Sequence, residues 1–256
     1  MTPPSTAARA GFRQALAHEW IKYRSLRSTL WTSAAIALVP VAGAVFVAAT
    51  ASLQPDDTVL GGSLTLAVVA QILAAVLGAL LISGEYGSGS IHATFAACPR
   101  RGTVLAAKAI LIAALMFGLA LLSCTAAYWV GRGMLPSGQY APGEPMPALL
   151  GVAGSFGVSG LLGLAIGALV RHTAGAVTTV IAVILLPDLL APLFGDAQRW
   201  IAGISPTAVL QKLSQSSDAT AETVGSLGPW PSLWLVCGYT AAALLAAGWL
   251  LRRRDA

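Results

Sequence analysis

The sequence predicts an all-α polytopic membrane protein with six transmembrane helices, an N-terminal interfacial helix and a short cytoplasmic helix. Of its 256 residues, 56% are hydrophobic and only 10% are charged, whereas an ordinary soluble domain carries about 25% charged residues. The mean hydropathy is strongly positive. A chain of this length has room for about six spans of roughly 20 residues each.

Six long apolar runs bounded by charged residues are candidate spans. They cover residues 30–49, 64–82, 104–130, 149–170, 176–194 and 233–251. We therefore expect one transmembrane domain over residues 30–251. It follows a cytoplasmic segment at 1–29 and precedes a basic tail at 252–256.

The connections between spans alternate in charge. The N-terminal segment, the 83–103 loop with Lys108, Arg171 and the tail carry twelve basic and three acidic residues, whereas the opposite side carries three basic and seven acidic residues. The positive-inside rule then places both termini in the cytoplasm. Because the net charge of +5 reflects membrane orientation, it does not imply a nucleic-acid partner.

The N-terminal segment contains an amphipathic helix. At 100° per residue, one face within about 120° gathers apolar and aromatic side chains: Phe12, Leu16, Trp20, Tyr23 and Leu26. An aromatic stripe with basic flanks is typical of a helix that lies on anionic lipids.

Glu19 projects from the apolar face of this helix. A carboxylate there requires a cation or donor, and the candidates are Lys22, Tyr23 or an arginine of the first cytoplasmic loop. The alternative is a plain anchor whose Glu19 is solvated at the rim.

A short helix is also expected in the 83–103 loop. Ser88 or Ser90 can cap its start, and Pro99 stops it. One face at i, i+3, i+4 and i+7 spacing gathers four residues: Ile91, Thr94, Phe95 and Cys98. The pattern indicates a helix that docks to a soluble partner, or else a solvated loop that touches the lipid headgroups.

The order of elements, from HEWIKYRSLRSTLW through GEYGSGSI and PRRGTVLAAK, resembles the membrane subunit of the ABC-2 class of ABC transporters, most of which export. Members share a glutamate ending span two, a Gly-Thr or Gly-Ser pair, an apolar residue, Pro-Arg and a lysine early in span three. The matching residues are Glu85, Gly89, Ser90, Ile91, Pro99, Arg100, Arg101 and Lys108. The resemblance implies that this segment is the coupling helix, which sits in a groove of the ATPase. Ser90 stands where threonine is more usual.

The chain has no ATP site of the P-loop type, because no lysine in it follows a glycine. The resemblance implies that ATP and magnesium are bound by separate ATP-binding cassette ATPases, two of which bind a dimer of permease subunits. The second permease is another copy or a related chain. We therefore expect a transport subunit, not an enzyme, in a bacterial cytoplasmic membrane. The three scattered cysteines show no metal-site spacing.

Small residues recur every four positions in the fourth candidate span. They allow close helix contact, either across a dimer or gate or, as we favour, within the chain. They are Ser155, Ser159, Gly163 and Gly167. Residues 157–160 also spell the G-x-S-G of rhomboid proteases, but the histidine base required from span six is missing from residues 233–251. Proteolysis is therefore disfavoured.

Three polar residues within spans are candidates for a translocation path: Gln71, Thr178 and Thr179. Each could equally bond a backbone carbonyl. In the family that the chain resembles, spans two and five help to line the path. Asp188, after Pro187, leaves open an ion-coupled secondary transporter, although Pro187 and Pro192 should bend or end span five and place the acid near the outer surface.

The outer segment at 195–231 is too long for an ordinary turn. Ser205 and Pro206 indicate a helix start. The tryptophans at 200, 230 and 234 suit the outer interface. The resemblance suggests partly re-entrant helices that cap the path.

Overall fold

The structure is a computed structural model that describes residues 11–97, 101–136 and 138–253. Within these residues, the regular secondary structure is helical apart from an isolated bridge between Thr58 and Ala141. Six helices are long and apolar enough to cross a membrane: α2 (Arg27–Thr50), α4 (Ala67–Gly87), α6 (Arg101–Met134), α7 (Pro145–Val170), α8 (Thr173–Leu190) and α12 (Pro229–Arg253). This confirms the predicted fold class.

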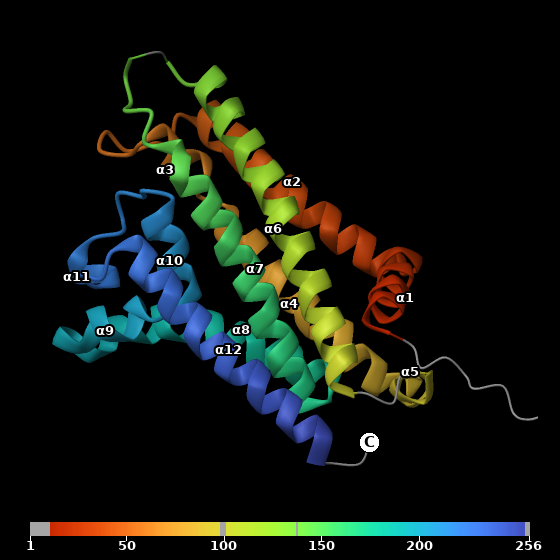
Figure 1. The fold of residues 1–256 in the computed structure, drawn as a ribbon. Helices are drawn as coiled ribbons and strands as arrows, with labels where there is room; N and C mark the ends of the chain where they lie inside the picture. The colour runs from red at the N-terminus through yellow and green to blue at the C-terminus, as the bar shows by residue number, and fades with distance from the viewer. Residues whose placement is uncertain (1–10, 98–100, 137, 254–256) are drawn as a thin grey trace, which may run out of the picture.

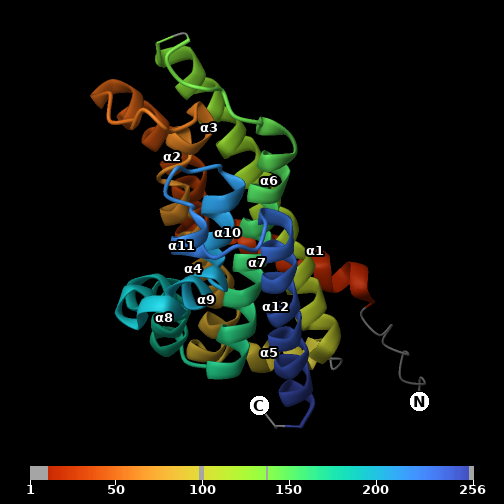
Figure 2. The ribbon, with the colours of Figure 1, turned by 90° about the vertical axis from the view of Figure 1, so that its left-hand side faces the viewer.

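The remaining helices are short and lie at the ends of the bundle. They are α1 (Phe12–Ser25), α3 (Val59–Ser63), α5 (Ser90–Ala97), η1 (Ala191–Ala197), α9 (Gln198–Gly203), α10 (Pro206–Leu213) and α11 (Ala221–Val224). α1, α5 and the final residues of α12 gather at one end, here called the α1–α5 end (Figure 1). α1 projects sideways from the bundle there, as expected of a helix lying along a membrane surface (Figure 2).

The six long helices coincide with the six predicted spans, and each extends beyond its apolar run at one end at least, although α4 begins later than predicted and α8 ends earlier. α6, for example, begins at Arg101 and ends at Met134, whereas the apolar run covers 104–130. Backbone hydrogen bonding continues into the polar flanks, because charged and glycine residues there do not break a helix whose centre is packed.

The centre of the bundle is a close contact between α4 and α7. A Cβ atom added to Gly163 would lie 1.8 Å from the carbonyl oxygen of Ala75, and one added to Gly78 would lie 2.0 Å from that of Gly160. The backbones therefore meet with no side chain between them, as small residues allow. The small-residue face of α7 thus packs within the chain, which is the favoured prediction, and 78% of the apolar part of α7 is buried.

α8 is the least buried span, with 17% of its apolar part covered. It contains Pro187 and ends at Leu190, after which the 3₁₀ helix η1 begins with Pro192 in its first turn. A proline near a helix end removes a backbone donor. The predicted bend or end of span five at these prolines is therefore confirmed.

The outer segment folds into α9, α10 and α11. Ser205 caps α10, since its hydroxyl accepts from the backbone N–H of Ala208 at 3.0 Å, and Pro206 occupies the first turn. This confirms the predicted helix start. Lys212, near the end of α10, donates to the Ser232 hydroxyl of α12 at 3.0 Å, which joins the segment to the last span.

Candidate functional site

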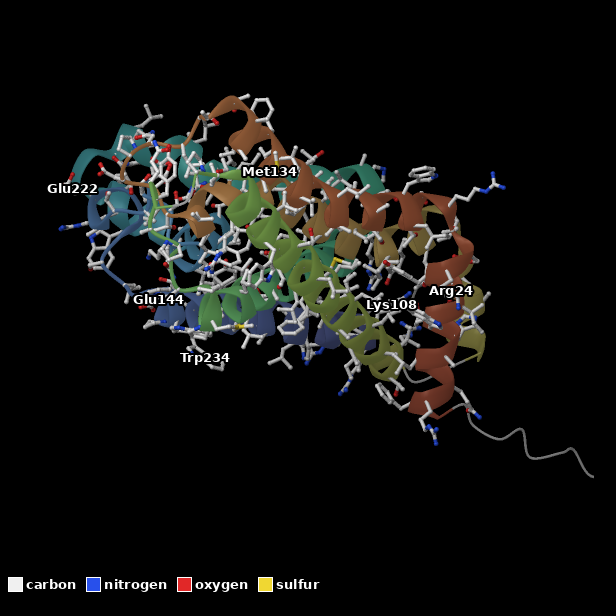
Figure 3. All side chains as sticks on the ribbon, turned by 90° about the horizontal axis from the view of Figure 1, so that it is seen from above. Arg24, Lys108, Met134, Glu144, Glu222 and Trp234 are labelled. Carbon is white, nitrogen blue, oxygen red and sulfur yellow. The ribbon has the colours of Figure 1, made fainter. Side chains whose placement is uncertain are left out.

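Four charged side chains from three helices meet at the α1–α5 end. Glu19 and Lys22 come from α1, Glu85 from the end of α4, and Lys108 from the second turn of α6. We call them the ion cluster. Figure 3 shows Lys108 beside α1, far from Glu144 and Glu222 at the other end of the molecule.

Lys108 is the centre of the ion cluster and is only 2% exposed. Its ammonium donates to Glu19 Oε2 at 2.5 Å, to Glu85 Oε1 at 2.6 Å and to the carbonyl of Leu81 at 3.3 Å. An ammonium has three donors, so these contacts use all of them. Burial of this charge is tolerable because two carboxylates compensate it.

Lys22 connects the ion cluster to α5. Its ammonium lies 2.8 Å from Glu85 Oε1 and 2.9 Å from the Thr94 hydroxyl of α5, and 3.6 Å from Glu19 Oε1. The first two contacts are hydrogen bonds, whereas the third is an ion-pair contact that is too long for a hydrogen bond. Lys22 of α1 therefore links Thr94 of α5 to Glu85 of α4. Glu85 in turn accepts from Lys108 of α6, so α5 is connected to three other helices.

The charged side chains of Glu19 and Lys108 point into the cluster because each lies on the buried face of its helix. Glu19 shares the inward face of α1 with Ala15 and Tyr23, four residues to either side. Lys108 lies between Leu105 and Leu111 on the buried side of α6. The expectation that Lys22 pairs with Glu19 holds, but the shorter contact of Glu19 is to Lys108. Sequence spacing missed that contact because it joins helices 89 positions apart.

Part of the predicted apolar face of α1 packs against the protein, and the rest is exposed. Tyr23 is buried and hydrogen-bonded to the Ser33 hydroxyl of α2, and Leu16 packs against the core. Phe12 and Trp20 are each 40% exposed, on the side that an interfacial helix turns to lipid. Burial raises the pKa of Tyr23 above its ordinary value, and the Ser33 bond opposes this rise; the phenol is therefore neutral.

The structure corrects the orientation predicted for α5. Ile91 and Thr94 are 2% and 5% exposed, so these two side chains of the predicted face pack against the chain itself and are not offered to a partner. Among residues 90–94, whose side chains the structure describes, Ser90, His92 and Ala93 are exposed. The single chain therefore covers the described part of the predicted face.

The turn into α5 depends on glycine, not on a serine cap. Gly89 has a φ of 70°, a conformation that costs other residues more, and α5 begins at the next residue. The hydroxyls of Ser88 and Ser90 bond each other at 2.9 Å.

The rest of the predicted coupling segment is only partly described. The Phe95 side chain, Cys98, Pro99 and Arg100 lie outside the described part of the structure. Arg101 donates to the carbonyl of Leu251 in α12 at 3.0 Å, which ties the start of α6 to the end of the last span.

Gln71 is fully buried and joins three helices. Its amide nitrogen donates to the Ser159 hydroxyl of α7 and to the carbonyl of Pro206 in α10, each at 3.1 Å. Gln71 therefore bonds a backbone carbonyl, which was the alternative to a place on the translocation path. Ser159, the serine of the G-x-S-G sequence, is likewise buried and bonded to an amide, so its role is packing.

Thr178 and Thr179 lie on the exposed side of α8. They line a cavity of about 660 Å³, together with Ser205 and Pro206 of α10 and Tyr239 of α12. The Thr178 hydroxyl donates to the carbonyl of Ala174, which leaves a mostly apolar surface toward the cavity.

Asp188 attaches α10 to α8. One carboxylate oxygen accepts from the Ser205 hydroxyl at 2.8 Å and the other from the Thr207 hydroxyl. These partners were not predicted, although Ser-Pro-Thr at a helix start is a recognisable donor group. Asp188 is therefore part of a hydrogen-bonded joint between two helices.

Within the described ranges, no group of three or more His, Cys, Asp or Glu side chains is placed to hold a metal ion. The site is instead an ion cluster at one end of a six-helix membrane bundle.

Six apolar helices and a buried ion cluster define a multi-pass membrane protein. The family model of the ABC-2 family transporter proteins matches residues 14–256, which is almost the whole chain. The chain therefore belongs to the ABC-2 transporter family and is a membrane permease of an ABC-type transporter. No curated protein matches the sequence significantly.

Proposed function

We propose that this permease is an exporter subunit driven by separate ATP-binding cassette ATPases, and that α5 is its coupling helix. The observation that carries the proposal is the Lys22 contact with both Thr94 and Glu85. Through it, a force applied to α5 reaches α1, α4 and α6 together. The family match supports a transport role, and the chain lacks a P-loop of its own.

The surface of α5 that meets the ATPase is formed by Ser90, His92 and Ala93, because these residues are exposed while Ile91 and Thr94 are covered. A small residue such as Ala93 allows close approach of a groove on the partner. ATP and magnesium bind to that partner.

ATP-driven movement of α5 is transmitted because the ion cluster resists separation. Pulling a buried lysine from its carboxylates leaves uncompensated charge, which costs several kcal/mol. α1, α4, α5 and α6 therefore move as one unit at this end. α4 extends the movement to the other end, where Gln71 contacts α7 and α10.

The translocation path passes the cavity that Thr178 and Thr179 line. Only 17% of the apolar part of α8 is buried in the single chain, so a second permease copy or a related chain completes this side. The protein lies in a bacterial cytoplasmic membrane with both termini in the cytoplasm, which the positive charge of the α1–α5 end supports.

Ala93→Trp tests the proposed ATPase surface. We expect loss of copurification with the ATPase encoded nearby, because the indole adds bulk on the contact surface without entering the core of the chain. The measurement is tagged purification from membranes followed by detection of the ATPase and assay of ATP hydrolysis.

Ala221→Trp is the matched control, since Ala221 is an exposed alanine of α11, remote from the α1–α5 end. It should retain the ATPase. Equal ATPase recovery with both variants, both folded as judged by thermal unfolding, would rule out this face of α5 as the docking surface.

A further inference from the structure

The cavity of about 660 Å³ lies between a membrane span and the outer segment of the chain. α8 contributes the largest part of its wall, and the rest comes from the segment of η1, α9 and α10 and from Tyr239 of α12. Its volume lies within the range of small-molecule sites. The chemistry of the wall therefore decides which class of molecule the cavity can hold.

The wall of this cavity is apolar and carries no charge among the described residues. None of the described residues that line it is acidic, basic or a histidine. Most are aliphatic or aromatic, and three of them, Leu186, Leu190 and Phe194, are 43%, 38% and 55% exposed. The wall therefore offers apolar contact, and its described part offers no partner for an ion pair.

Four hydroxyl groups interrupt the apolar wall. Those of Thr178, Ser205 and Tyr239 already donate hydrogen bonds to other groups of the chain. The fourth belongs to Thr179, which is exposed and has no hydrogen-bond partner among the described groups. The wall can therefore satisfy a neutral polar group, but it has no array of free donors for a strongly polar ligand.

The carboxylate of Asp188 does not supply the missing charge. Asp188 is not among the lining residues. Its two oxygens accept from the hydroxyls of Ser205 and Thr207, and both of these residues are only 1% exposed. The acid is therefore engaged in the joint between α8 and α10, and a cation in the cavity has no described carboxylate in the wall to pair with.

We propose that the cargo held in this cavity is an uncharged, mostly apolar small molecule. A charged group placed there would leave water without a counter-charge in the wall, and an unpaired ion at the level of a membrane span is strongly disfavoured. The inference rests on the proposed path through this cavity. Binding is measured on the permease alone, so its failure and a failure of ATPase docking are distinguishable.

The test is photolabelling of the full chain in lipid nanodiscs with three probes. They share one diazirine-bearing alkyl chain and end in an alcohol, a quaternary ammonium or a sulfonate. Adducts are mapped by mass spectrometry, and the yield at the cavity residues of α8 is divided by the yield around Leu122, which is 74% exposed on α6 and reports the probe dissolved in lipid.

We expect the alcohol to be enriched at the cavity over the α6 reference, and its normalised yield to exceed that of either charged probe at least about tenfold. A charged probe that labels the cavity as well as the alcohol does, or an alcohol yield no higher than at the α6 reference, would overturn the proposal.

Leu186→Trp fills the cavity and should reduce labelling by the alcohol to the level of the α6 reference. Leu185→Trp is the matched control, because Leu185 is similarly exposed, at 38%, but does not line the cavity; it should keep the enrichment. Enrichment in a folded Leu186→Trp chain would place the probe elsewhere and contradict the proposal. If that variant does not fold, the comparison of the three probes on the unaltered chain decides.

Discussion

Lys108→Met is expected to destabilise the folded chain by about 3–5 kcal/mol, the usual loss when one partner of a buried ion pair is removed. Methionine fills a similar volume, so the change isolates the charge. Glu19 and Glu85 would then face each other at the α1–α5 end with only Lys22 to compensate them. The measurement is the thermal unfolding midpoint of the purified chain, together with ATP hydrolysis in the complex.

Two further variants sharpen this result. Arg13→Met removes a charge from the exposed side of α1 and should leave the midpoint almost unchanged. Adding Glu19→Gln to Lys108→Met balances the remaining charges and should recover part of the lost stability, a coupling that a double-mutant cycle measures. If Lys108→Met unfolds at the same temperature as Arg13→Met, Lys108 does not compensate buried carboxylates.

Gly163→Ala is expected to be the most damaging single-methyl change in the bundle. Its Cβ would lie 1.8 Å from the carbonyl oxygen of Ala75, and a backbone carbonyl cannot rotate away as a side chain can. α4 and α7 must therefore separate, at a cost of about 3 kcal/mol or more, the upper end for overpacking. The checks are the yield of monodisperse protein and its unfolding midpoint.

Gly157→Ala is the control in the same helix. Its added Cβ would meet the carbonyl oxygen of Ala113 at 3.4 Å, which is ordinary contact, and alanine has the better helix propensity. We expect unchanged or slightly raised stability. If both variants behave alike, α4 and α7 are not in backbone contact at Gly163.

The fold was predictable because membrane spans follow from composition. Twenty apolar residues between charged ends are sufficient to identify a span, and all six were identified. Small residues at fourfold spacing on α7 likewise indicated close packing. Their partner, α4, could not be read from the sequence, because a glycine face fits any helix that approaches it closely.

The site was predictable in its residues but not in its contacts. Glu85, Lys108 and Thr94 were selected by resemblance and periodicity, and the structure brings all three to one end with Glu19 and Lys22. The inward orientation of Ile91 was missed, since an eight-residue helix presents its apolar face either to its own chain or to a partner. Gln71 was a candidate either for the path or for a bond to a backbone carbonyl, and it donates to the carbonyl of Pro206 and to the Ser159 hydroxyl.

The most direct test of α5 as the coupling helix is photo-crosslinking from position 93 in native membranes. A photoreactive amino acid at Ala93 reports whichever protein touches the exposed face of α5, and the same amino acid at Leu122 reports the lipid-facing side of α6. We predict a light-dependent adduct between position 93 and a P-loop ATPase, identified by mass spectrometry and missing from position 122. Adducts from position 93 with lipid alone, or only with this chain itself, would contradict ATPase docking at α5.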